Sequence, residues 1–198
     1  SMINSKMLFL INTFGKSTNY LSCDVARFGS DKTVICYWSG WRLEEVVVIT
    51  KSSLVDVANK IISLANMHKV SRSNIIIDED GMGGGVVDMV RNAKGFRNGS
   101  KALDGENYKN LKTQCYYKMA DKINNGEVYL GGGMNYMKEI IEEFESVRRF
   151  HYERDMTKLS ITPKENVKQT LGRSPDFSDS IVMRFWFELN RTRITYFG

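Results

Sequence analysis

Two apolar segments that each end in an aspartate constrain the fold of this chain most. Tyr20-Leu21-Ser22-Cys23-Asp24 and Asn74-Ile75-Ile76-Ile77-Asp78 have the length and composition of buried strands. Between them, residues 52–69 carry apolar side chains at helical spacing, with Ser52 or Ser53 as the N-cap. Neighbouring parallel strands require a crossover of this kind, so the pattern predicts a sheet in which both aspartates emerge at the same end.

The remaining segments predict further strands and helices around this pair. We expect strands at 19–25, 32–38, 41–49, 74–78 and 128–130, a hairpin between 150–154 and 158–161, and helices at 52–69, 86–91, 107–124, 136–145 and 164–171. Residues 27–31 are expected to form a turn and 94–105 a loop. A last long helix is expected to begin at Ser174, with Pro175 as its first residue. This order predicts an α/β fold with a mixed sheet, one antiparallel strand and flanking helices.

Composition limits the class of protein and its partners. A chain of 198 residues that is 42% hydrophobic can bury the core of one domain. No stretch approaches the roughly 20 apolar residues of a membrane span, so no membrane partner is expected. Three cysteines without CxxC spacing and only two histidines argue against a zinc site. The net charge of +5 favours nucleic acid as a partner, with a merely solvated basic face as the alternative.

Asp24, Asp78 and Asp179 are candidate metal ligands. A carboxylate at the end of a buried strand is costly unless a cation or a hydrogen-bond donor compensates it. Asp176 and Asp179 are three residues apart and share one side of the last helix. Oxygen ligands suit Mg²⁺ or Mn²⁺, and a pair of such ions suits phosphodiester hydrolysis. The structural alternatives are turn residues at strand ends and acids that favour a helix dipole.

Basic residues flank the third acid. Lys164 and Lys168 are four residues apart on one helix face, and Arg173 follows them. All three are candidates for contacts with DNA phosphates, although a solvated basic face has equal weight. The glycine-rich segment 81–85 lacks the Lys-Ser/Thr pair of a Walker A site, so it predicts a tight turn beside Asp78 rather than a nucleotide cradle.

Three segments, read together, resemble the three nuclease motifs of tailed-phage terminase large subunits. They are Cys-Asp-Val-Ala-Arg-Phe-Gly-Ser-Asp-Lys-Thr at 23–33, Ile-Ile-Ile-Asp-Glu-Asp-Gly-Met-Gly-Gly-Gly-Val-Val-Asp at 75–88, and Leu-Gly-Arg-Ser-Pro-Asp-Phe-Ser-Asp-Ser at 171–180. The third motif usually ends in Asp-Ala, where this chain has Asp179-Ser180. Their order and spacing also fit, as does the intervening segment 110–114, and the resemblance covers nearly the whole chain.

The resemblance implies a ribonuclease-H-like fold and a metal-dependent endodeoxyribonuclease that cuts concatemeric viral DNA during packaging. It places two Mg²⁺ or Mn²⁺ ions on the catalytic residues Asp24, Asp78 and Asp179, with Asp176 as a further candidate ligand. It also implies that residues 1–198 form a single nuclease domain, without the N-terminal packaging ATPase domain. The partners implied are double-stranded DNA, that ATPase domain, the portal and the small terminase subunit, in the host bacterial cytoplasm.

Two other classes of protein fit parts of the pattern. A Holliday-junction resolvase or a ribonuclease H has the same fold and also needs acidic clusters, but the Ser-Pro-Asp frame at 174–176 and the glycine-rich second motif favour terminase. A non-catalytic nucleic-acid-binding protein or portal adaptor would use the same acids structurally.

Overall fold

The computed structural model describes residues 1–6, 17–26, 32–131, 135–150 and 157–194. The described strands are β1 (Asn19–Asp24), β2 (Thr33–Ser39), β3 (Arg42–Ile49), β4 (Ile75–Asp78), β5 (Lys94–Phe96), β6 (Tyr129–Leu130), β7 (Arg149–Phe150) and β8 (Ser160–Ile161). The described helices are α1 (Leu54–Met67), α2 (Gly83–Met89), α3 (Leu111–Asn124), α4 (Met137–Ser146), α5 (Lys164–Leu171), α6 (Asp176–Met183) and α7 (Trp186–Ile194), with short 3-10 turns η2 (Arg72–Asn74) and η3 (Leu103–Gly105). None of the helices in these ranges has the length and apolar character needed to cross a membrane.

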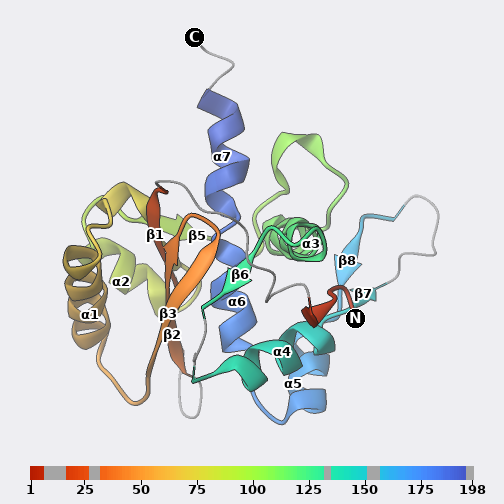
Figure 1. The fold of residues 1–198 in the computed structure, drawn as a ribbon, viewed down its shortest axis with the longest axis horizontal. Helices are drawn as coiled ribbons and strands as arrows, with labels where there is room; N and C mark the ends of the chain where they lie inside the picture. Colours follow the sequence, from red (N-terminus) through yellow and green to blue (C-terminus); the bar gives the residue numbers. More distant parts are fainter. Residues whose placement is uncertain (7–16, 27–31, 132–134, 151–156, 195–198) are drawn as a thin grey trace.

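The main sheet has the order β5-β4-β1-β2-β3-β6 (Figure 1). β2 pairs antiparallel with both β1 and β3, whereas β1–β4, β4–β5 and β3–β6 are parallel pairs. Strand β2 is therefore the one antiparallel member of this six-stranded sheet. The predicted mixed α/β sheet with flanking helices is confirmed.

Helices cover both faces of the sheet, and the alternation of side chains decides which face each residue meets. Leu21 and Ile77 pack in the core beneath α1 and α2. Tyr20 and Ile76 pack in the second core, which contains side chains of α3 to α7. The two layers lie on opposite sides of the sheet in Figure 1. A period of two along β1 and β4 therefore directs their terminal aspartates toward the layer that contains α6.

Helix α1 is the predicted crossover between the third and fourth strands. Ser53 caps it through a reciprocal capping box with Asp56, in which each side chain bonds the other residue's backbone N–H. Val57, Ile61 and Leu64 form its buried face. The cap therefore falls on the second of the two serines considered, and the parallel pairing of β1 with β4 is confirmed.

Two predicted boundaries in the middle of the chain are wrong. The expected loop at 94–105 contains β5, whose three residues extend the sheet at its edge beside β4. This strand is too short for a periodic pattern to reveal. Helix α3 begins at Leu111 rather than at 107, because Asn110 Oδ1 caps it by accepting the Thr113 N–H at 2.8 Å.

The last helix also differs from its prediction. It begins at Asp176 with Pro175 in the capping position, and the Ser174 hydroxyl has no hydrogen-bond partner in the part of the chain described. The expected single helix is divided into α6 and α7 around Arg184. The buried Arg184 guanidinium lies 3.7 Å from the centre of the Tyr20 ring and donates hydrogen bonds to Gly40 O.

The predicted hairpin is present as β7 and β8, which pair antiparallel as a separate two-stranded sheet. The predicted extension of its first strand to 151–154 and the predicted turn at 27–31 lie outside the described residues. Helix α5 ends at Gly172, whose φ of 69° is the left-handed conformation that glycine adopts without strain.

Candidate functional site

Asp24 and Asp78 leave two neighbouring parallel strands at the same edge of the sheet. Cys23 of β1 is paired with Ile77 of β4, so the aspartates follow in register. Only 5% of Asp24 and 7% of Asp78 is exposed to solvent. The arrangement predicted from the two apolar segments is thus present, and two acidic side chains are buried next to each other.

Burial and nearby negative charges disfavour ionisation of this pair. Burial raises the pKa of Asp24 well above its usual range, and the Asp179 and Asp78 charges raise it further. Burial also raises the pKa of Asp78. Hydrogen bonds from the Asp80 N–H (3.0 Å) and the Asp24 carboxyl offset part of that increase in pKa. The Asn98 amide also donates to Asp78 Oδ1 at 3.0 Å. Full ionisation of both carboxyls therefore calls for a cation in the site.

Asp179 enters from the first turn of α6, where three side chains hold its carboxylate. Lys112 Nζ of α3 lies 2.7 Å from Oδ1, and Lys164 Nζ of α5 lies 2.9 Å from Oδ2. The Tyr116 hydroxyl donates to Oδ1 at 2.7 Å. Burial alone would raise the pKa of Asp179, but the two ammonium groups hold it below its usual range. Asp179 is therefore ionised without a metal, unlike the strand-end pair.

Lys164 connects the helix acid with the strand-end acids electrostatically. Burial alone would lower the pKa of Lys164, whereas the Asp179 and Asp24 charges raise it overall. The same ammonium charge opposes the upward shift in the pKa of Asp24. Lys164 therefore stays charged and belongs to the same electrostatic cluster as Asp24 and Asp179.

A buried glutamate positions the start of α6. Glu143 of α4 is fully buried, and its Oε2 atom accepts the Ser178 N–H at 2.7 Å. Its Oε1 atom is paired with the Arg173 guanidinium. Burial raises the pKa of Glu143 to about 8, although the Ser178 N–H and Arg173 partly oppose the shift. These contacts hold the helix turn that presents Asp179.

The residue after Asp179 explains how α6 sits so close to the sheet. Ser180 is fully buried, and its Oγ lies 3.0 Å from both Ser22 O and Val34 O. Its hydroxyl donates to these carbonyl oxygens of β1 and β2. Ser180 is thus a hydrogen-bonded contact between the helix and the sheet.

Asp24, Asp78 and Asp176 line one cavity of about 270 Å³, which we call the acid cavity. Its other lining residues are Val25, Ala26, Asp80, Asn98, Lys112, Lys164, Glu165 and Lys168. Asp176 is 5% exposed, and its Oδ2 atom accepts the Lys32 N–H at 3.0 Å. The structure therefore brings all four predicted acids to the same region, although Asp179 borders the neighbouring cavity.

The donor groups of the acid cavity fit a hard divalent cation. Two buried carboxyls with raised pKa values, at adjacent strand ends, offer the oxygen ligands that Mg²⁺ and Mn²⁺ prefer. Across the described ranges, however, no three His, Cys, Asp or Glu side chains are already placed as a metal-binding group. The Asp179 carboxylate contacts lysines instead, so three-carboxylate coordination requires that side chain to move.

The glycine-rich segment forms the tight turn expected beside Asp78. A Cβ atom on Gly83 would lie 1.6 Å from Asp78 O, so only glycine allows α2 to start this close to the end of β4. Gly81, with a φ of 66°, provides the preceding left-handed turn. The two acids that follow Asp78 make different contacts. Asp80 lines the acid cavity, and its Oδ2 atom accepts a hydrogen bond from Asn98. Glu79 forms an ion pair with Arg97 outside that cavity.

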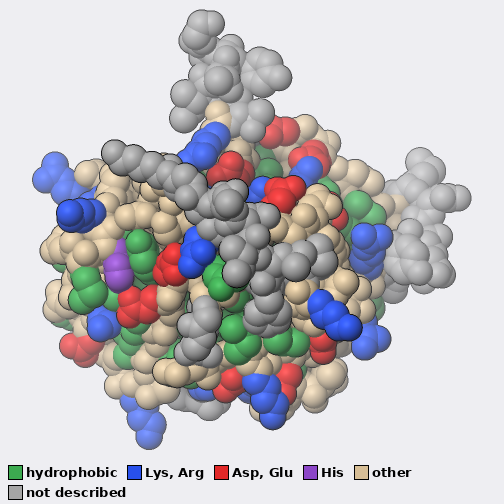
Figure 2. All heavy atoms as spheres, viewed as in Figure 1, with side chains coloured by type: hydrophobic (Ala, Val, Ile, Leu, Met, Phe, Trp, Pro, Cys, Tyr) green, Lys and Arg blue, Asp and Glu red, His purple; other side chains and the backbone are tan. Residues whose placement is uncertain are grey.

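The three predicted phosphate-binding residues have different surroundings. Lys164 is paired with Asp179, and Lys168 lines the acid cavity. Arg173 is directed to α4, where it contacts Glu142 and Glu143. On the face shown in Figure 2, basic and acidic side chains are interspersed without a continuous basic track. Any DNA contact by these residues stays a prediction.

Sequence reasoning missed three side chains of the site. Lys112 and Tyr116 hold Asp179, and Asn98 bonds both Asp78 and Asp80. The spacing of Lys112 and Tyr116 places them on one face of α3, but no local pattern indicates that this face meets α6. Asn98 lies in the segment expected to be a loop, and no sequence pattern there indicates a residue of the site.

The fold is shared with solved nuclease domains of phage terminases. The nuclease domain of the large terminase subunit gp2 of bacterial virus Sf6 matches with a TM-score of 0.80 at 17% identity, covering 93% of this chain and 97% of that chain. A mutant of that domain solved with manganese matches with a TM-score of 0.78 at 16% identity, covering 93% and 98%. The large terminase nuclease of thermophilic phage G20c, solved with bound magnesium, matches with a TM-score of 0.61 at 12% identity, covering 93% and 96%.

Comparisons of the amino-acid sequence identify no related protein. No protein-family model matches the chain, and no curated protein matches it. At these identities the structural likenesses establish the fold. The expected ribonuclease-H-like α/β fold, with the architecture of phage terminase nuclease domains, is confirmed.

Proposed function

We propose that this chain, which has the fold of phage terminase nuclease domains, is a metal-dependent endonuclease that cleaves double-stranded DNA. Its role is to cut concatemeric viral DNA during packaging, together with a packaging ATPase domain, a small terminase subunit and a portal. One observation carries the proposal: Asp24 and Asp78 are buried at adjacent strand ends, in one cavity with Asp176, Lys112 and Lys164.

Asp24 and Asp78 would hold a first divalent ion, and Asp179 would contribute to a second, with Asp176 as a further candidate. The manganese and magnesium forms of the structural neighbours support Mg²⁺ or Mn²⁺ as the ions. Such ions lower the pKa of an attacking water and neutralise the leaving oxygen of a phosphodiester. The buried carboxyls must lose their protons to ligate, which couples metal binding to proton release.

The chain's own residues orient this site and attract its substrate. Asn98 and the Asp80 N–H fix the Asp78 carboxyl, and Glu143 fixes the α6 turn through Ser178. The ammonium groups of Lys112 and Lys164 line the acid cavity and supply charge complementary to a phosphate. A phosphate that enters the cavity therefore gives both lysines a second anionic partner besides Asp179.

A comparison of substrates tests the proposal against its rivals. Plain duplex DNA, a four-way junction and an RNA–DNA hybrid are incubated with the protein in Mn²⁺, with Asp24→Asn as the matched control. We expect cleavage of the duplex, lost in the control. A strong preference for the junction or the hybrid would instead indicate a resolvase or a ribonuclease H. Absence of cleavage of all three would indicate a non-catalytic binding protein or adaptor.

A further inference from the structure

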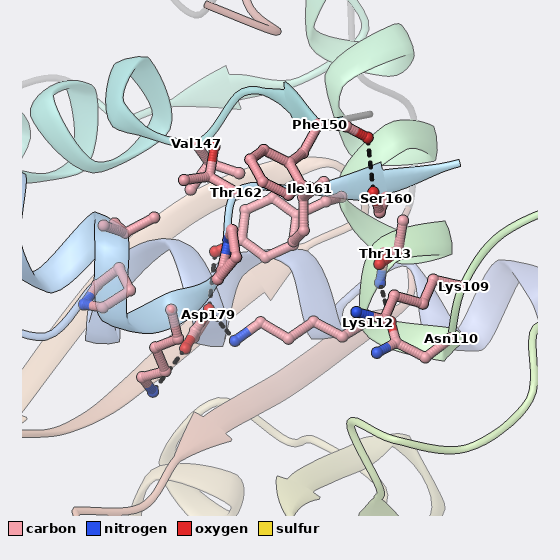
Figure 3. Close-up of a pocket in the computed structure, with 15 residues that line it drawn as sticks. Lys109, Asn110, Lys112, Thr113, Val147, Phe150, Ser160, Ile161, Thr162 and Asp179 are labelled. Atoms are coloured by element: carbon pink, nitrogen blue, oxygen red, sulfur yellow. Dashed lines mark hydrogen bonds and ion pairs between the residues drawn. The ribbon is translucent and has the colours of Figure 1, made fainter. Parts of the chain in front are cut away.

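A second cavity, drawn in Figure 3, shares two lining residues with the acid cavity, Lys112 and Lys164. It has a volume of about 320 Å³ and lies between α3, the β7–β8 hairpin and α5. Val147, Phe150 and Ile161 contribute apolar walls, so we call it the apolar cavity. Its walls differ sharply from the carboxylate lining of the acid cavity, which indicates a different ligand group.

The charges of the apolar cavity favour an anionic ligand with an apolar body. Lys109, Lys112 and Lys164 contribute three cations to its lining. Among the described residues that line it, Asp179 is the one acid, and its carboxylate is already paired with two of the lysines. Figure 3 shows the Lys112 side chain extending from α3 to Asp179, and Lys112 also lines the acid cavity. An anion bound at these lysines can thus reach into both cavities.

We propose that the apolar cavity binds one nucleoside of the DNA, unstacked from the duplex, whose phosphate lies against Lys112 and Lys164. This inference rests on the proposed function, because it takes the phosphate in the acid cavity to belong to DNA. The volume lies at the lower end of the range for small-molecule pockets. A single base and its sugar fit such a space, whereas a stacked base pair does not.

The lining has the groups that hold a single base. Phe150 contributes an aromatic ring to the lining, and stacking on such a ring tolerates every base because each base has a π face. Asn110 uses Oδ1 to cap α3, and its amide NH₂ group retains two hydrogen-bond donors for a base edge. The cavity therefore suits an endonuclease that unstacks a nucleotide beside its cleavage point without reading sequence.

Mononucleotide binding tests the inference without any cleavage. The protein in EDTA is titrated with dAMP, TMP, deoxyribose 5-phosphate and inorganic phosphate, and amide chemical shifts are followed by NMR. We expect both nucleotides to shift residues of the apolar cavity and to bind at least about fivefold more tightly than deoxyribose 5-phosphate, from base stacking. Equal affinities, or shifts confined to the acid cavity, would overturn it.

Two variants locate the site. Ile161→Trp fills the cavity and should abolish the preference for nucleotides, while Val55→Trp, on the exposed surface of α1, should not. Phe150→Leu keeps apolar volume but removes the ring, so it should weaken dAMP binding by about fivefold and leave phosphate binding unchanged. Unaltered dAMP affinity in folded Ile161→Trp or in Phe150→Leu would contradict the assignment.

Wild-type plasmid cleavage in Mn²⁺, measured separately, distinguishes the two proposals. Cleavage without selective nucleotide binding would reject the proposed nucleoside site but support the proposed nuclease activity. Nucleotide selectivity without cleavage would support the pocket while rejecting the nuclease.

Discussion

Lys164 Nζ lies 2.9 Å from Asp179 Oδ2, so α5 supplies a cation to the acid carried by α6. Only residues 172–175 separate these helices, and the turn at Gly172 brings them together. Lys112 reaches the other carboxylate oxygen from α3. The charge of Asp179 is therefore compensated by two cations, whereas Lys164 opposes only part of the upward shift in the pKa of Asp24.

Removing one acid of the Asp24–Asp78 pair should stabilise the metal-free protein. Asp24→Asn or Asp78→Asn replaces a carboxyl, whose ionisation burial and nearby acids disfavour, with a neutral amide. One pKa unit corresponds to about 1.4 kcal/mol, and about 1 kcal/mol shifts the Tm of a chain of this size by about 2–4 °C. Thermal melts in EDTA should show increases of about 3 °C or more. The exposed Asp88→Asn control should melt as wild type does, and a lower Tm in both site variants would contradict the account.

Removing a cation from Asp179 should have the opposite effect. Lys112→Met keeps most of the side-chain volume but leaves Asp179 with Lys164 and Tyr116 alone. Breaking a buried ion pair costs about 3–5 kcal/mol, and because two partners remain we expect a loss of about 1–3 kcal/mol in the free energy of unfolding. Urea denaturation measures it, with the exposed Lys109→Met as control. Equal losses of unfolding free energy in the two variants would mean that the contact between Lys112 and Asp179 does not stabilise the fold.

Glu143 should make stability decrease as the pH rises. Its pKa is about 8 in the folded protein, above the usual value of 4.5. Between these values the folded state binds more protons than the unfolded state, so this group's contribution to stability falls from about pH 5 to pH 8. The free energy of unfolding of wild type relative to Glu143→Gln should therefore fall by at least about 1.4 kcal/mol over this range. A difference that is constant with pH would refute the shifted pKa.

Salt dependence should rank the basic residues that flank the third acid, Asp179. Lys168→Ala should reduce the slope of log affinity for duplex DNA against log salt by about 0.9, the value for one phosphate contact. Arg173→Ala should leave the slope unchanged, because its guanidinium contacts Glu142 and Glu143. Lys60→Ala, on the exposed surface of α1, is the control, and a larger effect of Arg173 than of Lys168 would reverse this ranking.

The strand-end acids could be predicted because their placement follows from local rules. Alternation along β1 and β4, with one crossover helix between β3 and β4, determines the face and the edge at which Asp24 and Asp78 emerge. Local sequence rules do not suffice to place the third acid, Asp179, because its position depends on how α6 packs. That packing involves Ser180 against β1 and Glu143 against Ser178, both contacts between distant segments.

The surroundings of the acids could not be predicted from the sequence. Lys112 and Asn98 contact acids 67 and 20 positions away, and neither lies in a segment whose pattern indicates its partner. Arg173 illustrates the opposite difficulty. The sequence predicts a phosphate contact for it, which stays a prediction, and gives no sign that its guanidinium also pairs with the buried Glu143 of α4.

The most direct test of the central claim is cleavage of supercoiled plasmid by the purified chain. We predict that Mg²⁺ or Mn²⁺ supports conversion to open-circular and then linear DNA, that EDTA stops it, and that Asp24→Asn and Asp78→Asn abolish it while retaining the fold. Asp88→Asn should cleave as wild type does. Wild-type rates in Asp24→Asn and Asp78→Asn, or equal cleavage in EDTA and in metal, would contradict a metal-dependent nuclease site at these two aspartates.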